Sequence, residues 1–114
     1  MIFHFEKAVK LEFEGFVAFI YNSKRELGEL SSVYVECHGT HARVSVIASF
    51  RLYFVLEGAG IFEVGGEEEA VMAKDVIIVP PRVPYSYKGQ MKMFEVNAPA
   101  TGPEDERAEP EVCS

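Results

Sequence analysis

The chain has 114 residues, of which 48% are hydrophobic and 12% aromatic, and its formal net charge is −7 at pH 7. This length fits one domain with a core of its own. The acidic balance argues against nucleic-acid binding, because phosphate contacts need clustered Lys and Arg. No apolar run reaches the roughly 18 residues that a membrane-spanning helix needs. We therefore expect one domain that binds neither nucleic acid nor membrane.

The ends of the chain and its cysteines bear on the compartment. Met1–Lys7 has no basic stretch followed by an apolar run, so it does not read as a secretory signal. We expect a cytoplasmic protein on that ground. Cys37 and Cys113 are the only cysteines. Two separate thiols in a reducing compartment fit better than a disulfide tying the chain end to the domain.

Short strand signals follow one another along the chain. Leu11–Glu14 alternates apolar and acidic residues, Phe16–Tyr21 is a continuous apolar run that favours a buried strand, and Asn22–Ser32 is polar and predicts a loop. Gly65-Gly66 is typical of a tight hairpin. Roughly nine or ten short strands without an amphipathic helix predict an all-β sandwich or barrel. Further strands are predicted at Val33–Cys37, Ala42–Ala48, Leu52–Leu56, Ile61–Val64, Ala70–Ala73, Val76–Val79, Ser86–Lys88 and Met91–Val96.

Negative charge gathers at the carboxyl end of the chain. Residues 103–114 contain five acids and one base, together with Pro103 and Pro110. Such a stretch is typical of a solvated terminus. We expect residues 1–100 to form the single domain and residues 101–114 to form an acidic, mobile tail.

Two spaced motifs resemble those of a known family. The first reads Gly39-x5-Ser45-x-Ile47-x3-Arg51-x6-Gly58, and the second reads Lys74-x5-Pro80-x-Arg82-x2-Tyr85-x3-Gly89. They resemble the cupin motifs G-x5-H-x-H-x3,4-E-x6-G and G-x5-P-x-G-x2-H-x3-N. The resemblance extends over roughly residues 33 to 99 and implies a cupin-like jelly-roll β-barrel, also called a double-stranded β-helix. By analogy it also implies a homodimer.

The four positions at which cupins hold a divalent metal are all replaced. Ser45, Ile47, Arg51 and Tyr85 stand where the family has His, His, Glu and His. First-row metals prefer imidazole, carboxylate or thiolate ligands, and a fixed cation such as Arg51 repels them. We therefore expect no metal and no other cofactor.

Strand alternation predicts which side chains enter the barrel. Positions 45 and 47 share a face, as do positions 51, 53 and 55, and positions 85 and 87. The last strand contributes either Met93 with Glu95 or Phe94 with Val96, and burial of Phe94 and Val96 is the simpler arrangement. The predicted lining is Ser45, Ile47, Arg51, Tyr53, Val55, Tyr85 and Tyr87, and all of these except Val55 are predicted to contact a ligand.

Arg51 is the most informative of these residues. A buried guanidinium needs a partner. Arg51 forms a structural ion pair with a residue such as Glu95, or faces water at the barrel mouth, or anchors a carboxylate, phosphate or sugar oxygen of a ligand. Tyr85 is either a wall residue or a group that positions a ligand or acts as a general acid, and His41 near the barrel mouth is a second acid–base candidate.

Two function classes remain open. The first is a metal-independent barrel that binds a small polar or anionic ligand, a carbohydrate or an organic anion, of the kind that serves as a sensor module. The second is a metal-free sugar or sugar-nucleotide isomerase or epimerase, as the cupin resemblance implies, with Tyr85 and His41 as acid and base. The predicted lining contains no histidine, and this favours the binding protein.

Overall fold

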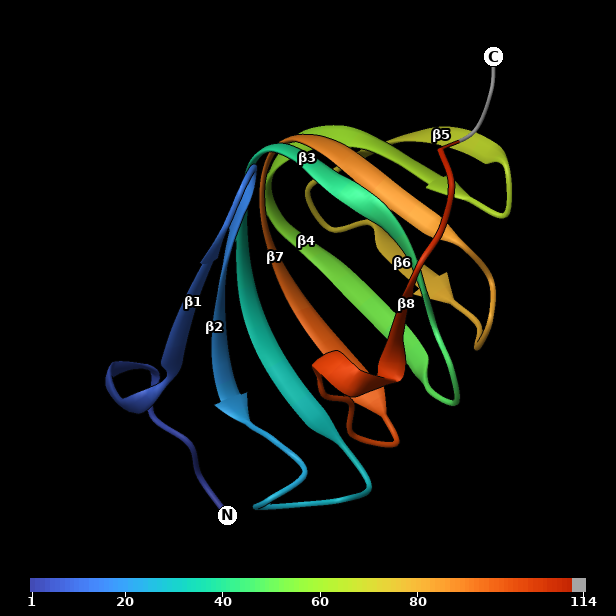
Figure 1. The fold of residues 1–114 in the computed structure, drawn as a ribbon. Coiled ribbons are helices and arrows are strands. Elements are labelled where there is room, and N and C mark those ends of the chain that lie inside the picture. Colours follow the sequence, from blue (N-terminus) through green and yellow to red (C-terminus); the bar gives the residue numbers. More distant parts are fainter. Residues whose placement is uncertain (112–114) are drawn as a thin grey trace.

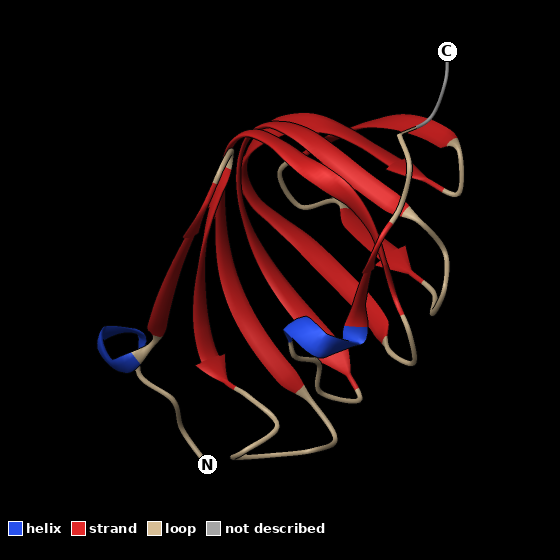
Figure 2. Cartoon of the chain, viewed as in Figure 1, coloured by secondary structure: helices blue, strands red, loops and turns tan. Residues whose placement is uncertain are grey.

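The computed structural model describes residues 1–111, and its regular secondary structure is almost entirely β-strand (Figures 1 and 2). The only helical elements in that range are two single turns of 3-10 helix, η1 (Phe5–Lys7) and η2 (Pro103–Asp105), and none is long and apolar enough to cross a membrane. The all-β prediction is confirmed. The strands are β1 (Val9–Phe13), β2 (Phe16–Asn22), β3 (Ser31–Val46), β4 (Phe50–Val64), β5 (Glu67–Met72), β6 (Val76–Val79), β7 (Tyr85–Ala98) and β8 (Glu106–Ala108).

The strands form one antiparallel sheet that folds over on itself. Its order is β1-β2-β3-β7-β4-β5, with β6 paired to the first part of β4 and β8 paired to the end of β3. The long strands β3, β7 and β4 curve through both layers, with β1, β2 and β6 in one layer and β5 and β8 in the other (Figure 1). This is the predicted jelly-roll barrel.

A row of glycines lies where the three long strands pass from one layer to the other. Gly39 pairs with Gly89, which in turn pairs with Gly60. Gly89 has a φ of 142°, and a Cβ there would lie 2.6 Å from the carbonyl oxygen of Ala59. Only glycine allows this close approach of backbones. The sequence patterns stop at these glycines, which explains why six strands were predicted where the structure has three.

The barrel interior is filled by the inward side chains of the long strands. Tyr53, Val55, Phe62, Tyr85 and Met93 are each at most 2% exposed. The tight hairpin predicted at Gly65-Gly66 is present between β4 and β5. The two glycines form its turn with positive φ values of 60° and 91°.

One orientation was predicted wrongly. Met93 and Glu95 point into the barrel, while Phe94 and Val96 lie on the outer side of β7 and are partly exposed. Both faces of this strand carry apolar residues, so the alternation alone does not decide between them. Glu95 is accommodated inside because Arg51 lies against it, with 3.5 Å between Nε and Oε2.

Residues 101–108, predicted to belong to a mobile tail, are part of the barrel. β8 pairs with β3 from Val44 to Val46, and Lys24 Nζ lies 2.5 Å from Asp105 Oδ2. The predicted domain boundary at residue 100 therefore does not coincide with a structural one. Cys37 is buried and Cys113 lies outside the described residues, so the two separate thiols stay a prediction.

Candidate functional site

A hollow of about 200 Å³ opens between the β1–β2 hairpin and the carboxyl-terminal segment of residues 101–106. Its outer wall is apolar and its floor carries an imidazole, a guanidinium, two carboxylates and an amide. We call it the barrel pocket. It is lined by Leu11, Phe13, Phe16, Ala18, Ile20, Asn22, Ser23, Ser31, Val33, Val35, His41, Arg51, Glu95, Asn97, Thr101, Gly102, Pro103 and Glu106.

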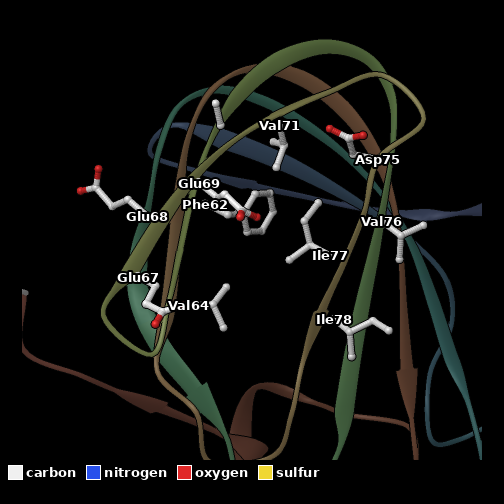
Figure 3. A pocket seen from close by; sticks show the side chains of 11 residues that line it. Phe62, Val64, Glu67, Glu68, Glu69, Val71, Asp75, Val76, Ile77 and Ile78 are labelled. Atoms are coloured by element: carbon white, nitrogen blue, oxygen red, sulfur yellow. The ribbon is translucent and has the colours of Figure 1, made fainter.

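A larger cleft of about 530 Å³ lies between β5 and β6, beside β4 (Figure 3). Phe62, Val71 and Ile77 form its buried apolar base, and its polar groups are the exposed carboxylates of Glu67–Glu69 and Asp75. No imidazole or cation lines it. The barrel pocket is therefore the better candidate for a site, because only there are titratable groups held at fixed positions by burial and hydrogen bonds.

Arg51 is at the centre of the polar floor and is only 5% exposed. Its Nη1 donates to the hydroxyl of Tyr85 at 2.7 Å and to Glu106 Oε1 at 2.6 Å. Its Nε donates to Asn97 Oδ1 at 2.5 Å, and Nη2 donates to Thr101 Oγ1 at 3.3 Å. Four of its five N–H groups are thus used by the protein itself.

The charge of Arg51 is more than balanced by its neighbours. Burial by itself lowers the pKa of Arg51, but Glu95, Tyr85, Tyr53 and Glu106 raise it well above its ordinary value. The guanidinium therefore stays charged, with two carboxylates beside it. The ion pair of Arg51 with Glu95, one of the roles predicted from the sequence, is confirmed. Because two carboxylates already neutralise the guanidinium, it would attract an anionic ligand only weakly.

Two tyrosines form a buried layer behind Arg51. The hydroxyls of Tyr53 and Tyr85 are 2.7 Å apart, and Tyr85 also accepts the Arg51 bond. Burial raises the pKa of Tyr85 to about 12 and raises the pKa values of Tyr53 and Tyr87 well above their ordinary value. All three phenols are therefore protonated at neutral pH. The three side chains point into the barrel as predicted, but none of them lines the barrel pocket.

His41 lines the barrel pocket in a fixed tautomer. Its Nδ1 lies 2.6 Å from the carbonyl oxygen of Ala42, and since a carbonyl only accepts, Nδ1 carries the proton. Its ring stacks against Tyr87 at 4.7 Å and Phe16 packs on it, tilted, at the same centroid distance. Burial lowers the pKa of His41, so the neutral imidazole has a free lone pair on Nε2.

Nε2 of His41 faces accessible space. It has no hydrogen-bond partner, whereas every fully buried side-chain nitrogen or oxygen among residues 1–111 has one. A lone pair held in this way, in a hollow with an apolar wall, is the geometry expected of a general base. The sequence prediction named His41 only as an alternative, yet it is the group best placed for chemistry.

Two of the residues predicted to line the barrel do not face its interior. Ile47 is 43% exposed on the surface. Ser45 is buried, but on the side of β3 that faces the carboxyl-terminal segment, where its hydroxyl donates to Glu109 at 3.0 Å. The cause is a β-bulge between His41 and Val44, which reverses the alternation for the rest of the strand. Val44 and Val46 take the inward positions instead.

Other pocket residues were not recognised from the sequence. Glu106 and Thr101 lie in the stretch that reads as a solvated tail, and nothing local distinguishes Glu106 from the acids around it. Asn97 follows the last predicted strand directly, so extending its alternation by two residues from Glu95 would have found it. Within residues 1–111 no group of three or more His, Cys, Asp or Glu side chains is arranged to hold a metal.

Comparison with solved structures gives the same fold. The structure superimposes on that of a histidine-to-glutamine variant of Streptomyces PAC13 with uridine at a TM-score of 0.88 and 25% identity, covering 98% of this chain and 92% of that one. Pac13, described as a unique nucleoside dehydratase with a β-barrel, gives a TM-score of 0.89 at 25% identity over 99% and 93% of the two chains. No family model and no curated protein matches the chain.

More distant structures share the barrel alone. KdgF from Halomonas sp. matches with a TM-score of 0.75 at 15% identity, over 89% of this chain and 94% of that one. Oxalate decarboxylase from Bacillus subtilis matches with a TM-score of 0.79 at 16% identity, over 93% of this chain and 31% of the longer one. These neighbours support the cupin-like fold that the motif spacing implied.

Proposed function

We propose that the barrel pocket binds an uncharged nucleoside, or a sugar derivative of similar size, without a metal. The observation that carries this proposal is the pairing of an apolar wall with a polar floor whose one cation is already neutralised. A ligand for such a site needs a flat, weakly polar part, a part with several hydroxyls, and no negative charge.

The apolar wall suits a nucleobase. Phe13 and Phe16 are stacked with centroids 4.6 Å apart and ring planes 11° from parallel, at the mouth of the pocket. Phe13 is 48% exposed, so part of its surface is free to receive a ligand. Stacking of a base on an aromatic side chain contributes about 1–3 kcal/mol.

The polar floor suits sugar hydroxyls. Glu95 and Glu106 supply carboxylate oxygens, and Nη2 of Arg51 retains one free N–H. Neighbouring hydroxyls both donate and accept, so they fit a mixture of carboxylate acceptors and an N–H donor. A phosphate would meet two carboxylates around one guanidinium and be repelled. This narrows the ligand prediction to neutral compounds.

The similarity to Pac13 structures points to the same ligand class, because one of them contains uridine. Uridine is therefore the first compound to test, by calorimetric titration. We expect saturable binding to the native protein and its loss in Ala18→Phe, because Ala18 is 8% exposed and lines the pocket. The control is Ala70→Phe, on the exposed side of the other cleft. Equal binding by both variants would refute the proposal.

A second candidate function is acid–base catalysis by His41. The free lone pair of Nε2 and the likeness to a nucleoside dehydratase both favour it. In such a reaction Nε2 takes a proton from a carbon next to a carbonyl group. The C–O bond on the adjacent carbon then breaks, and a carbon–carbon double bond forms. The departing hydroxyl receives the proton back from the imidazolium and leaves as water. The predicted isomerase or epimerase would share the first of these steps.

Proton exchange separates the enzyme from the binding protein. Nucleosides that carry a carbonyl on the sugar would be incubated with the protein in D2O and followed by NMR. Acid–base catalysis predicts exchange or loss of the adjacent carbon-bound proton. It also predicts at least about a hundredfold slower exchange for His41→Gln, since a positioned base contributes about 10² to 10⁴ in rate. Binding without exchange in the native protein would leave only the first function.

A further inference from the structure

The apolar wall of the barrel pocket is built from adjacent positions of β1, β2 and β3, which lie side by side at one edge of the sheet (Figure 1). In its middle row, Leu11 of β1 pairs with Ala18 of β2, and Ala18 pairs with Val35 of β3. In the row on one side, Phe13 pairs with Phe16. Directly paired residues of an antiparallel sheet lie on the same face. These side chains therefore form one continuous surface, and all of them line the pocket.

This wall joins the polar floor at both of its ends. In the row on the other side, Ile20 pairs with Val33, and Val33 pairs with Glu95. At the opposite end, the ring of Phe16 packs on His41, with centroids 4.7 Å apart. A ligand whose sugar contacts Glu95 and His41 therefore places its remaining part over the wall.

The wall is larger than a single six-membered ring. Strands about 4.8 Å apart and same-face rows about 6.6 Å apart give three strands and three rows a span of roughly 10 by 13 Å. Leu11 is 36% exposed and Phe13 is 48% exposed, so the β1 side of this surface is uncovered. A pyrimidine would cover only part of the wall, and a bicyclic ring would cover more of it.

The polar side chains that border the wall are engaged within the protein. Asn22 donates to a backbone carbonyl oxygen at 2.7 Å and accepts from the Ser32 hydroxyl at 2.6 Å. The Ser23 hydroxyl donates to Glu26 at 3.1 Å. Oγ of Ser31 accepts from a backbone N–H at 3.2 Å. A ligand that used these groups would have to compete with the hydrogen bonds they already make.

These contacts distinguish two kinds of ligand. Uracil and cytosine carry carbonyl and N–H groups on their edges, which lose water on an apolar surface and gain no partner there. An aromatic ring without such groups avoids this loss and still stacks on Phe13. A site that selects a nucleobase places hydrogen-bonding groups against its edge, and the side chains of the wall carry none.

We propose that the barrel pocket prefers a neutral aryl glycoside, with the sugar on the polar floor and an apolar, bicyclic aromatic aglycone on the wall. The proposal rests on the proposed function, because it keeps the neutral sugar at the floor. It selects among the sugar derivatives that fit there. A nucleobase with hydrogen-bonding edges becomes a weaker ligand than an apolar ring of larger area.

Calorimetric titration with four neutral ribosides tests this preference. 2-Naphthyl β-D-ribofuranoside has an apolar bicyclic aglycone, uridine and cytidine have bases with different hydrogen-bonding edges, and methyl β-D-ribofuranoside has only a methyl group. We expect the naphthyl riboside to bind at least about tenfold more tightly than uridine. The dissociation constants of uridine and cytidine should agree within about threefold, because the wall does not distinguish their edges.

A polar group placed in the wall gives the matched variant. Leu11→Gln changes a position that is 36% exposed, and should weaken the naphthyl riboside at least about threefold more than the methyl riboside. Phe13→Gln serves in its place if Leu11→Gln does not fold. Met72→Gln is the control, since Met72 is 64% exposed on β5 and does not line the pocket.

The outcomes separate the ligand preference from the function of the pocket. Uridine binding as tightly as the naphthyl riboside, or more than about tenfold more tightly than cytidine, would overturn the preference and leave the proposed function in place. Equal weakening of the naphthyl and methyl ribosides in Leu11→Gln would overturn the preference too. If none of the four ribosides binds, the proposed function fails, and the preference fails with it.

Discussion

Nη1 of Arg51, inside the barrel, donates a hydrogen bond of 2.6 Å to Oε1 of Glu106, which comes from a short strand at the carboxyl end of the chain. This contact ties residues 101–108 to the barrel and makes them one side of the candidate site. It also neutralises the positive charge that a ligand in the pocket would otherwise meet. The same pair therefore serves the stability of the fold and the selectivity of the pocket.

Removal of Arg51 should destabilise the protein strongly. In Arg51→Met the carboxylate of Glu95, which is 8% exposed, loses its cation. Loss of one partner of a buried pair costs about 3–5 kcal/mol. Urea denaturation followed by tyrosine fluorescence measures the difference. Arg25→Met, in an exposed loop, is the control and should change the unfolding free energy by less than about 0.5 kcal/mol. Equal values for the two variants would contradict the role of Arg51.

Glu106→Gln should change selectivity more than stability. The amide retains an oxygen that accepts from Arg51, while one of the two carboxylates near the guanidinium disappears. We expect binding of uridine 5′-phosphate to improve at least about threefold relative to uridine, because one unit of repulsion is removed. Parallel calorimetric titrations give this ratio. An unchanged ratio would show that the charge around Arg51 does not select the ligand.

The pH dependence of stability should reveal the buried His41. Its pKa in the folded protein is below the ordinary value of about 6.5, so the unfolded chain binds the proton more readily. Stability therefore rises with pH through this range and is progressively lost as pH falls below about 6.5. Thermal melts between pH 7.5 and pH 5 should show a steeper loss for the native protein than for His41→Gln. Parallel curves would mean that His41 is not held neutral by the fold.

Gly89→Ala should impair folding. A Cβ at this position would lie 2.6 Å from both the carbonyl oxygen of Ala59 and Cα of Gly60, and the φ of 142° disfavours any side chain. We expect a loss of about 3 kcal/mol or more in unfolding free energy. Gly28→Ala provides the comparison, since a Cβ there meets nothing within 4 Å, and it should be nearly neutral. A mild effect at Gly89 would argue that the strands do not depend on the glycine row.

The sequence was most informative where local patterns and global fold agree. The resemblance of the two motifs between Gly39 and Gly89 to those of the cupin family implies the jelly roll, and strand alternation places Arg51, Tyr53, Tyr85 and Tyr87 inside it. The alternation misplaces Ser45 and Ile47, because nothing in the sequence marks the β-bulge between His41 and Val44. The alternation also misplaces Phe94, since both sides of β7 carry apolar residues, one side facing the core and the other the outside of the barrel.

Contacts between residues far apart in the chain could not be predicted from the sequence for a different reason. Glu106 sits in an acidic stretch whose members look equivalent, and only the folded chain brings one of them to Arg51, 55 residues away. The same holds for the imidazole of His41, whose position and tautomer are fixed by the carbonyl of Ala42 and the rings of Phe16 and Tyr87. Sites assembled from distant strands are recognised once the register is known.

The most direct test of the account is to titrate the native protein with uridine and with uridine 5′-phosphate under the same conditions. A pocket whose guanidinium is neutralised by Glu95 and Glu106 predicts that uridine binds at least about tenfold more tightly than its phosphate. Tighter binding of the phosphate would show that Arg51 is available to anions, and would contradict the central claim.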